Sequence, residues 1–146
     1  KELSLGEILN WSLTKINKSK CFPDYIIYLN PEYVFRPKNF FDKIIEQIIY
    51  KGLDSVFMGY QDYANYWSFE NKNNKYKPIN TELLDRNNKS PLFKSLFGLG
   101  CIVKPKLIRN KTLVSDEKVE IISTNVLKYT LRTNDSNMRK IIEAIL

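Results

Sequence analysis

The sequence contains no histidine among its 146 residues and only two cysteines. The lack of histidine excludes Ser-His-Asp and Cys-His catalysis and histidine-ligated zinc within this chain. Cys21 and Cys101 are too few for a four-thiolate metal site, and neither belongs to a CxxC motif. We therefore expect two free thiols in a reducing compartment, with a single disulfide as the alternative.

Long apolar runs are also missing, since the longest fall far short of the roughly 20 residues that cross a bilayer. Together with the expected free thiols, this predicts a cytoplasmic protein that does not bind a membrane. The length suits one domain spanning residues 1–146, and 43% hydrophobic residues with 13% aromatics are enough for a core.

The chain has a net charge of +7, but arginine is scarce: only five of its 23 cationic residues are Arg. The cations are spread along the chain, whereas a nucleic-acid surface clusters Arg and Lys with stacking aromatics. Joint enrichment in Lys, Asn and Ile is typical of an AT-rich genome. We therefore expect no nucleic-acid partner, and the charge instead favours an anionic substrate. Nucleic-acid binding is a weaker alternative, and it would show a steep salt dependence.

The first half of the chain has clear periodic segments. Residues 4–7, SLGE, form a capping box, and apolar spacing predicts a helix to about residue 17. Residues 24–30 read as a buried strand of the kind found in parallel sheets. An amphipathic helix follows from Pro37 to a stop at Gly52, and residues 54–60 form the next strand. This order predicts a parallel βαβ unit.

The second half indicates a β-hairpin insertion with a polar tip at residues 70–74, followed by a polar loop over residues 80–91. The elements expected there are hairpin strands at 66–69 and 75–79, strands at 96–103 and 119–122, a helical turn at 106–110, and a last helix that Ser136 caps. The predicted fold class is α/β.

Four other residues have two interpretations each. Cys101, in an apolar run, is expected to be a small buried hydrophobe rather than a nucleophile. Asp54 is expected to cap the strand start or to be solvated there rather than to act in catalysis. Gly98 and Gly100 mark either a β-bulge or a close approach to a ligand, and the bulge is favoured.

One loop combines residues that suit ligand binding. The predicted strand at 24–30 runs into residues 29–37, LNPEYVFRP, before a helix. In parallel α/β sheets, ligands bind beyond the carboxyl ends of the strands, where Asn30 and Arg36 would stand. Asn offers a donor and an acceptor, and Arg offers a planar fork for anions. In the alternative interpretation, Asn30 caps the strand and Arg36 is solvated.

This stretch resembles the acylneuraminate cytidylyltransferases, the CMP-sialic acid synthetase family. That family has a Leu-Gln-Pro-Thr-Ser-Pro-Leu-Arg type motif, which residues 29–31 and 35–36 match with Asn30 in place of Gln. Residues 51–57, KGLDSVF, resemble the family's helix stop and second strand. Further similar segments run over residues 66–69, 77–79, 86, 91–93 and 100–103. The resemblance covers roughly residues 24–109, with a weaker match in the last helix.

The resemblance implies a Rossmann-like nucleotide-diphospho-sugar transferase fold and usually a homodimer. It implies a reaction that joins CTP to an acidic sugar of sialic-acid type and releases pyrophosphate, with Mg²⁺. It also implies an acidic-sugar pocket to which five residues contribute or lie near: Asn30, Arg36, Tyr66, Trp67 and Arg86.

The chain departs from the family in two places. The family opens with a strand and a Gly-rich loop that cradles CTP, and nothing comparable occurs here. We therefore expect the carboxy-terminal portion of such a domain, inactive by itself. The family also has Asp-Ile-Asp before its final helix as metal ligands, where this chain has residues 132–134, RTN. Asp135 is adjacent and is the candidate metal ligand. A non-catalytic sugar-binding or subunit-association scaffold is the alternative function.

Overall fold

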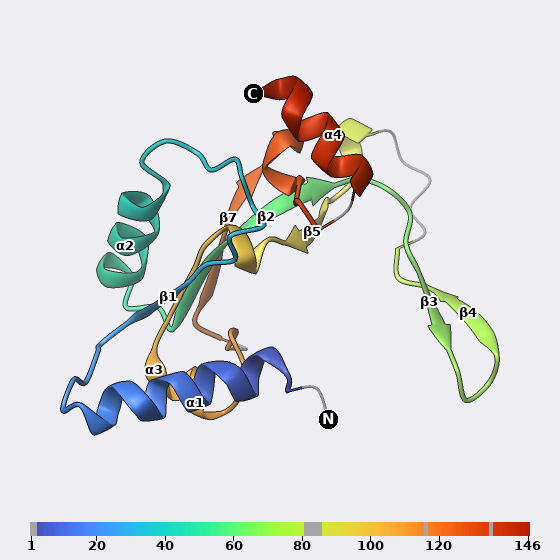
Figure 1. Cartoon of the computed structure of the whole chain (residues 1–146). Helices are drawn as coiled ribbons and strands as arrows, with labels where there is room; N and C mark the ends of the chain where they lie inside the picture. Colours follow the sequence, from blue (N-terminus) through green and yellow to red (C-terminus); the bar gives the residue numbers. More distant parts are fainter. Residues whose placement is uncertain (1–2, 81–85, 116, 135) are drawn as a thin grey trace.

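The computed structural model describes residues 3–80, 86–115, 117–134 and 136–146. Its centre is a five-stranded mixed sheet (Figure 1). The strands of this sheet are β1 (Ile26–Tyr28), β2 (Ser55–Asp62), β5 (Leu92–Ser95), β6 (Cys101–Val103) and β7 (Val119–Thr124). The protein is therefore an α/β protein, as the sequence predicts.

The strand β2 is central because it pairs along both edges. The parallel strand β7 pairs with residues 55–60 of β2. The antiparallel strands β6 and β5 pair with residues 55–57 and 59–62. Since β7 occupies one edge, β6 and β5 lie end to end along the other, joined through the short 3-10 helix η2 (Phe97–Leu99).

The predicted parallel βαβ unit is present, but its two strands are not neighbours in the sheet. β1 and β2 run in the same direction, but β6 lies between them and pairs antiparallel with both. β1 is also not a buried strand, since Ile27 and Leu29 are 40% and 45% exposed. Among the described strands β1 pairs only with β6, so it lies at the edge of the sheet.

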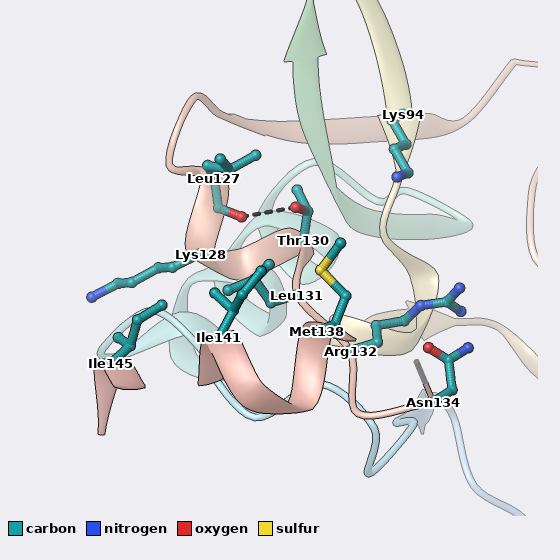
Figure 2. Close-up of a pocket in the computed structure, with 10 residues that line it drawn as sticks. All are labelled: Lys94, Leu127, Lys128, Thr130, Leu131, Arg132, Asn134, Met138, Ile141 and Ile145. Atoms are coloured by element: carbon teal, nitrogen blue, oxygen red, sulfur yellow. Dashed lines mark hydrogen bonds between the residues drawn. The ribbon is translucent and has the colours of Figure 1, made fainter. Parts of the chain in front are cut away.

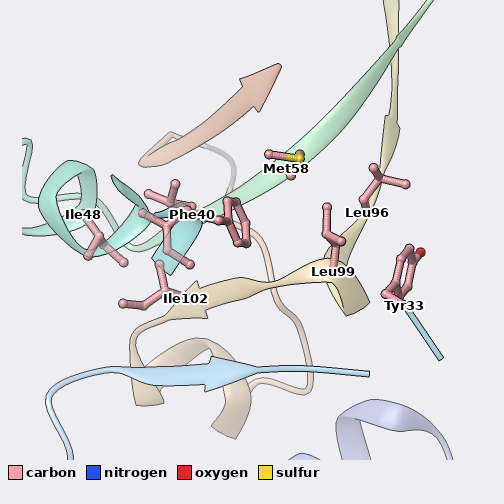
Figure 3. Close-up of a cluster of buried hydrophobic side chains, with 9 residues drawn as sticks. Tyr33, Phe40, Ile48, Met58, Leu96, Leu99 and Ile102 are labelled. Carbon is pink, nitrogen blue, oxygen red and sulfur yellow. The ribbon is translucent and has the colours of Figure 1, made fainter. Parts of the chain in front are cut away.

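The helix α2 (Phe40–Tyr50) covers one face of the sheet. It follows the predicted boundaries, and Gly52, at φ +62°, ends it in the left-handed region that glycine tolerates. Figure 3 shows its side chains against those of the sheet and of the loop after β1. The buried members of this cluster are Tyr33, Phe40, Ile44, Ile48, Val56, Met58, Leu96, Leu99 and Ile102.

The helices α1 (Leu5–Lys18) and α3 (Pro105–Arg109) cover the opposite face. α1 begins with the predicted capping box, in which Ser4 and Glu7 exchange hydrogen bonds. Leu13 and Ile108 pack there against Phe57 and Cys101. Cys101 is fully buried and Cys21 is exposed, and both thiols are free, as expected. Burial raises the pKa of the Cys101 thiol to about 12, so this cysteine is the small hydrophobe that its context predicts.

Asp54 is not solvated, in contrast to the prediction, because it is only 5% exposed. Its carboxylate lies 3.0 Å from Lys104 Nζ and 2.6 Å from Lys106 Nζ. The hydrogen bond from Lys106, followed by that from Lys104, lowers the pKa of Asp54 below its usual value. This ion pair fastens the start of β2 to the start of α3.

The single strand predicted at 96–103 is broken, for a steric reason. A Cβ atom at Gly98 would lie 2.7 Å from Asn30 Cβ and from the Tyr33 ring. A Cβ atom at Gly100 would lie 2.3 Å from the Phe40 ring. The two glycines thus allow close packing of distant residues, and residues 97–99, which include Gly98, form η2 instead of continuing the ladder.

The predicted hairpin is present as β3 (Trp67–Glu70) and β4 (Lys75–Pro78), a separate two-stranded sheet that projects from the body (Figure 1). The last helix is α4 (Ser136–Ile145), preceded by the 3-10 helix η3 (Leu127–Thr130). A further 3-10 helix, η1, spans Arg86–Asn88. No described helix is long and apolar enough to cross a membrane.

Candidate functional site: two cavities that share Lys94

The strands β1, β2 and β7 run in one direction, so their carboxyl ends point the same way, although β1 ends level with Phe57 and β2 continues to Asp62. The loop containing Asn30 follows β1, Asp62 ends β2, and η3 follows β7. The carboxyl ends of codirectional strands are the usual ligand-binding edge of an α/β sheet. The structure therefore brings several of the sequence-predicted residues to one rim.

Asn30 organises the loop after β1. Its side-chain oxygen accepts from the Glu32 backbone N–H at 2.9 Å, and its amide donates to Glu32 Oε2 at 3.2 Å. Its backbone N–H donates to the Gly98 carbonyl at 2.8 Å. Asn30 thus forms a tight turn that is anchored to the segment before β6.

Arg36 donates three of its N–H groups to backbone carbonyls in this region. The acceptors are the carbonyls of Leu99, Tyr33 and Asn30, at 3.0, 2.7 and 2.9 Å. Of the five guanidinium N–H donors, two are left for any other partner. Arg36 therefore ties the loop to the sheet, a role that neither sequence interpretation included.

The same loop contacts the segment before α4. Tyr33 forms an antiparallel bridge with Arg132, whose guanidinium carbon lies 5.9 Å from the centre of the Tyr33 ring. The Thr133 N–H donates to the Glu32 carbonyl at 3.1 Å, and Arg132 Nη1 lies 3.9 Å from Glu32 Oε2. The loop at 29–37 and the segment at 132–134, where the family has its carboxylates, are thus neighbours.

A cavity of about 510 Å³ lies beside this segment, between β5, η3 and α4. Figure 2 shows Lys94, Arg132 and Asn134 on one side of it, with Lys128 and Ile145 on the other. Apolar side chains of η3 and α4 lie between the two sides. None of the described lining residues is acidic, so the electrostatic potential of this cavity favours anions.

A second cavity of about 470 Å³ adjoins the first through Lys94, which lines both. Asp62, Tyr66 and Phe93 also line it, with Ile79 and Leu92. The Tyr66 hydroxyl donates a short hydrogen bond to Asp62 Oδ2, and the Ala64 N–H donates to Oδ1 at 2.9 Å. The bond to Tyr66 lowers the pKa of Asp62 and raises that of Tyr66.

Lys89 is a buried cation near this second cavity, since its charge helps to lower the pKa of Asp62. Its Nζ donates to the Tyr63 carbonyl at 2.8 Å and to Asn65 Oδ1. Within the described part of the chain, Lys89 forms no ion pair. Lys89 therefore holds the turn after β2 in place and leaves a positive charge close to Asp62.

The other sequence-predicted site residues are placed as follows. Trp67 is 59% exposed in the hairpin and lines neither cavity. Arg86 begins η1, but its side chain lies outside the described residues, as does Asp135. The sequence did not indicate Lys94, Asp62 or Lys89. Residues 92–95, LFKS, do not alternate apolar and polar side chains, so the sequence gives no clear signal for the strand that carries Lys94 to the rim.

Mg²⁺ does not fit the residues that the structure describes. Over the described ranges, no group of three or more His, Cys, Asp or Glu side chains could hold a metal ion. Arg132 and Asn134 provide a cation and an amide where the resemblance implies carboxylates, and these are poor ligands for Mg²⁺. The chemistry derived below therefore uses only the side chains of this chain.

No protein-family model matches the chain, and the curated proteins contain no significant match to it. The acylneuraminate resemblance therefore depends on the sequence motifs alone, and the function is inferred from the residues at the rim and in the two cavities.

Proposed function

We propose that the chain contributes the acidic-sugar subsite of a cytidylyltransferase-type nucleotidyltransferase, with a partial Rossmann-like nucleotide-diphospho-sugar transferase fold. The complete enzyme would join CTP to an acidic sugar of sialic-acid type and release pyrophosphate. The observation that supports the subsite is the position of Lys94, a cation that lines both cavities and stands on the same side of the larger one as Arg132. By this proposal the 146-residue chain has no CTP turnover by itself.

The division of polar groups between the cavities suits such a ligand. Lys94 and Arg132 would hold the sugar carboxylate, because charge-assisted hydrogen bonds to Arg and Lys are the strong ones. Asn134 lies on the same side and offers an amide. In the second cavity the Asp62 carboxylate can accept hydrogen bonds from sugar hydroxyls, with Tyr66 beside it.

The remaining loop residues act through this arrangement. Asn30 and Arg36 fix the loop that holds Tyr33 against Arg132. In this proposal they are positioning residues at the rim of the pocket, while Lys94 and Arg132 contact the sugar. Loss of either loop residue would therefore shift Arg132 and weaken carboxylate binding without removing a direct contact.

Calorimetric titration of the chain with N-acetylneuraminic acid and with its uncharged methyl ester tests the subsite. We expect the acid to bind at least about tenfold more tightly, equal to about 1.4 kcal/mol. Lys94→Met and Arg132→Met should abolish this preference. Lys72→Met at the exposed hairpin tip removes the same charge elsewhere and should preserve it. Equal affinity for acid and ester would contradict the proposal.

Activity by the isolated chain is a separate test. Release of pyrophosphate by the purified chain with CTP, acidic sugar and Mg²⁺ would show that the proposed inactivity is wrong. Binding of the acid without turnover agrees with the subsite proposal. Stabilisation by CTP with Mg²⁺ in addition to the sugar would favour an enzyme over the non-catalytic sugar-binding alternative, because a ligand stabilises the state to which it binds.

A second candidate function, subunit association, is favoured by the hairpin. Trp67, Phe69, Tyr76 and Ile79 are 59%, 47%, 73% and 59% exposed on or beside its two strands. A lone two-stranded hairpin is marginally stable in water, so such an arm gains from contact with another surface. We propose that the arm contributes to a homodimer. Light scattering of the Phe69→Ser/Tyr76→Ser variant should then give a lower mass than the unaltered chain, and an unchanged mass would contradict this role.

A further inference from the structure

The far end of the larger cavity is an apolar groove that the chain leaves uncovered. Leu127 and Lys128 of η3 form one wall, and Ile141 and Ile145 of α4 form the other. Leu127, Ile141 and Ile145 are 63%, 45% and 49% exposed. Figure 2 shows Lys128 and Ile145 on the side away from Lys94 and Arg132. This groove, defined by these four residues, is distinct from the proposed carboxylate position.

The outer face of α2 has the complementary character. Asp42 and Glu46 are one helical turn apart and both are exposed, and so lie on one side of the helix. Ile45 and Ile49 form a parallel stripe beside them, and Ile49 is 61% exposed. Within the described part of the chain, neither acidic side chain forms an ion pair.

We propose that the groove takes α2 of a second copy of this chain. The two isoleucines of that helix would fill the apolar groove, and its Asp42 and Glu46 would face Lys128. This is helix-in-groove recognition, in which apolar positions one turn apart provide the anchors. Figure 1 shows α2 and α4 on separate parts of the molecule, so α2 does not cover the groove of its own chain.

Local charge complementarity supports a second copy, against the net charge of the chain. The chain carries +7 overall, so most contacts between copies bring like charges together. On α2, the acidic residues Asp42 and Glu46 lie beside the apolar Ile45 and Ile49. At the groove, Lys128 lies beside apolar side chains, and no described residue that lines the cavity is acidic. This contact would bury apolar side chains of both copies and place Asp42 and Glu46 of one copy close to Lys128 of the other.

The proposed contact joins two different surfaces, so it is heterologous. Each copy has one α2 helix and one groove. Two copies form a closed dimer only if the helix of each copy binds the groove of the other at the same time. Otherwise further copies can add to the free helix and the free groove, and the average mass of the assembly increases with concentration. The proposal does not depend on the acidic-sugar subsite, because it uses none of Lys94, Arg132 or Asp62.

Sedimentation velocity of the whole chain from about 10 μM to 1 mM measures self-association, and variants that reverse the charges of Glu46 and Lys128 test the proposed contact. We expect Glu46→Lys and Lys128→Glu each to weaken self-association about tenfold, as charge reversals at close interfacial pairs do. The double variant should recover most of the association, because it restores an unlike pair. Lys72→Glu at the hairpin tip has the same charge change and should have no effect.

Apolar substitutions provide an independent readout. Ile49→Ser and Ile141→Ser should each reduce association at least tenfold while thermal unfolding stays cooperative, since the two side chains are 61% and 45% exposed in the single chain. If Glu46→Lys does not fold, the single variants Glu46→Gln and Lys128→Met remove the charges without reversing them. Each should weaken self-association.

Four results would overturn the proposal. The first is a chain that stays monomeric at 1 mM. The second is a double charge variant no stronger than the single variants. The third is association that disappears only in Phe69→Ser/Tyr76→Ser, which assigns it to the hairpin. The fourth is a monomeric chain that binds anionic vesicles and loses this binding in Ile141→Ser. That result would identify a lipid surface, and not a second copy, as the occupant of the groove.

Discussion

The centre of the sheet and its outer elements differ in how far they cover their own apolar side chains. In β2 and β6, residues 55–59 and 101–103 are all buried, with α2 on one face and α1 and α3 on the other. In the β3–β4 hairpin and α4, large apolar side chains stay exposed, and Ile142 is the described α4 residue that is buried. The centre is thus stabilised within one chain, whereas the outer elements present surface for contacts with ligands or other molecules.

Truncation in the core gives the largest effect and tests whether the centre alone determines stability. Ile44 of α2 is fully buried in the cluster around Phe40 and Val56. We expect Ile44→Ala to lower the free energy of unfolding by about 2–5 kcal/mol, because it removes buried methyl groups and leaves a cavity. The matched change Ile49→Ala on the exposed side of the same helix should cost below about 1 kcal/mol. Urea denaturation measures both, and similar losses would contradict the comparison.

The buried ion pair of Asp54 is expected to come next. Asp54→Asn should cost about 1–3 kcal/mol, because it weakens the charge-assisted hydrogen bonds from Lys104 and Lys106. The folded state lowers the pKa of Asp54, so its contribution is present above the unfolded pKa of about 3.9 and is lost as the pH falls through the lower folded value. The difference between the two proteins should therefore be constant from pH 6 to 8 and shrink below about pH 4. A constant difference at all pH values would exclude the charge as its cause.

A tight backbone approach links the centre to the candidate site. Gly98→Ala would place a Cβ atom 2.7 Å from Asn30 Cβ and from the Tyr33 ring. We expect a loss of about 1–3 kcal/mol from this overpacking. Because the loop must move, the same variant should also weaken acidic-sugar binding. Thermal unfolding and calorimetric titration check the two effects, and a stability loss with unchanged sugar affinity would separate the loop from the site.

The smallest expected change lies at the start of α1. Ser4→Ala removes the capping hydrogen bond to the Glu7 backbone N–H, and we expect a loss of about 1 kcal/mol. Ser12→Ala, at a partly exposed position inside the helix, should change stability by less than about 0.5 kcal/mol. Equal effects of both variants would show that the capping box does not contribute.

Local patterns predicted the helices and the hairpin because their signals are short-range. The capping box at Ser4, the amphipathic spacing before Gly52 and the polar tip at 70–74 each specify structure within a few residues. Strand order does not follow from such signals. The insertion of β6 between β1 and β2, and the break at Gly98 and Gly100, result from contacts with residues more than 40 positions away.

The candidate site was predictable to a similar extent. The position of Asn30 and Arg36 at the rim follows from a strand that ends before a proline-rich loop. The three backbone carbonyls that occupy Arg36 could not be foreseen, because two of them belong to a turn whose shape depends on tertiary packing and the third to Leu99. Lys94 was missed because a four-residue strand has too little pattern to distinguish it from a loop.

The contrast between the two free thiols gives the protein a built-in chemical reporter. Cys21 is exposed, so a thiol-specific dye should label it alone in the folded chain. Cys101 is fully buried between the sheet and α1, and burial raises its pKa to about 12. Its alkylation must therefore wait until the sheet opens and the thiol can ionise. The rate at which a second label appears would follow the opening of the core, in a protein that carries no introduced probe.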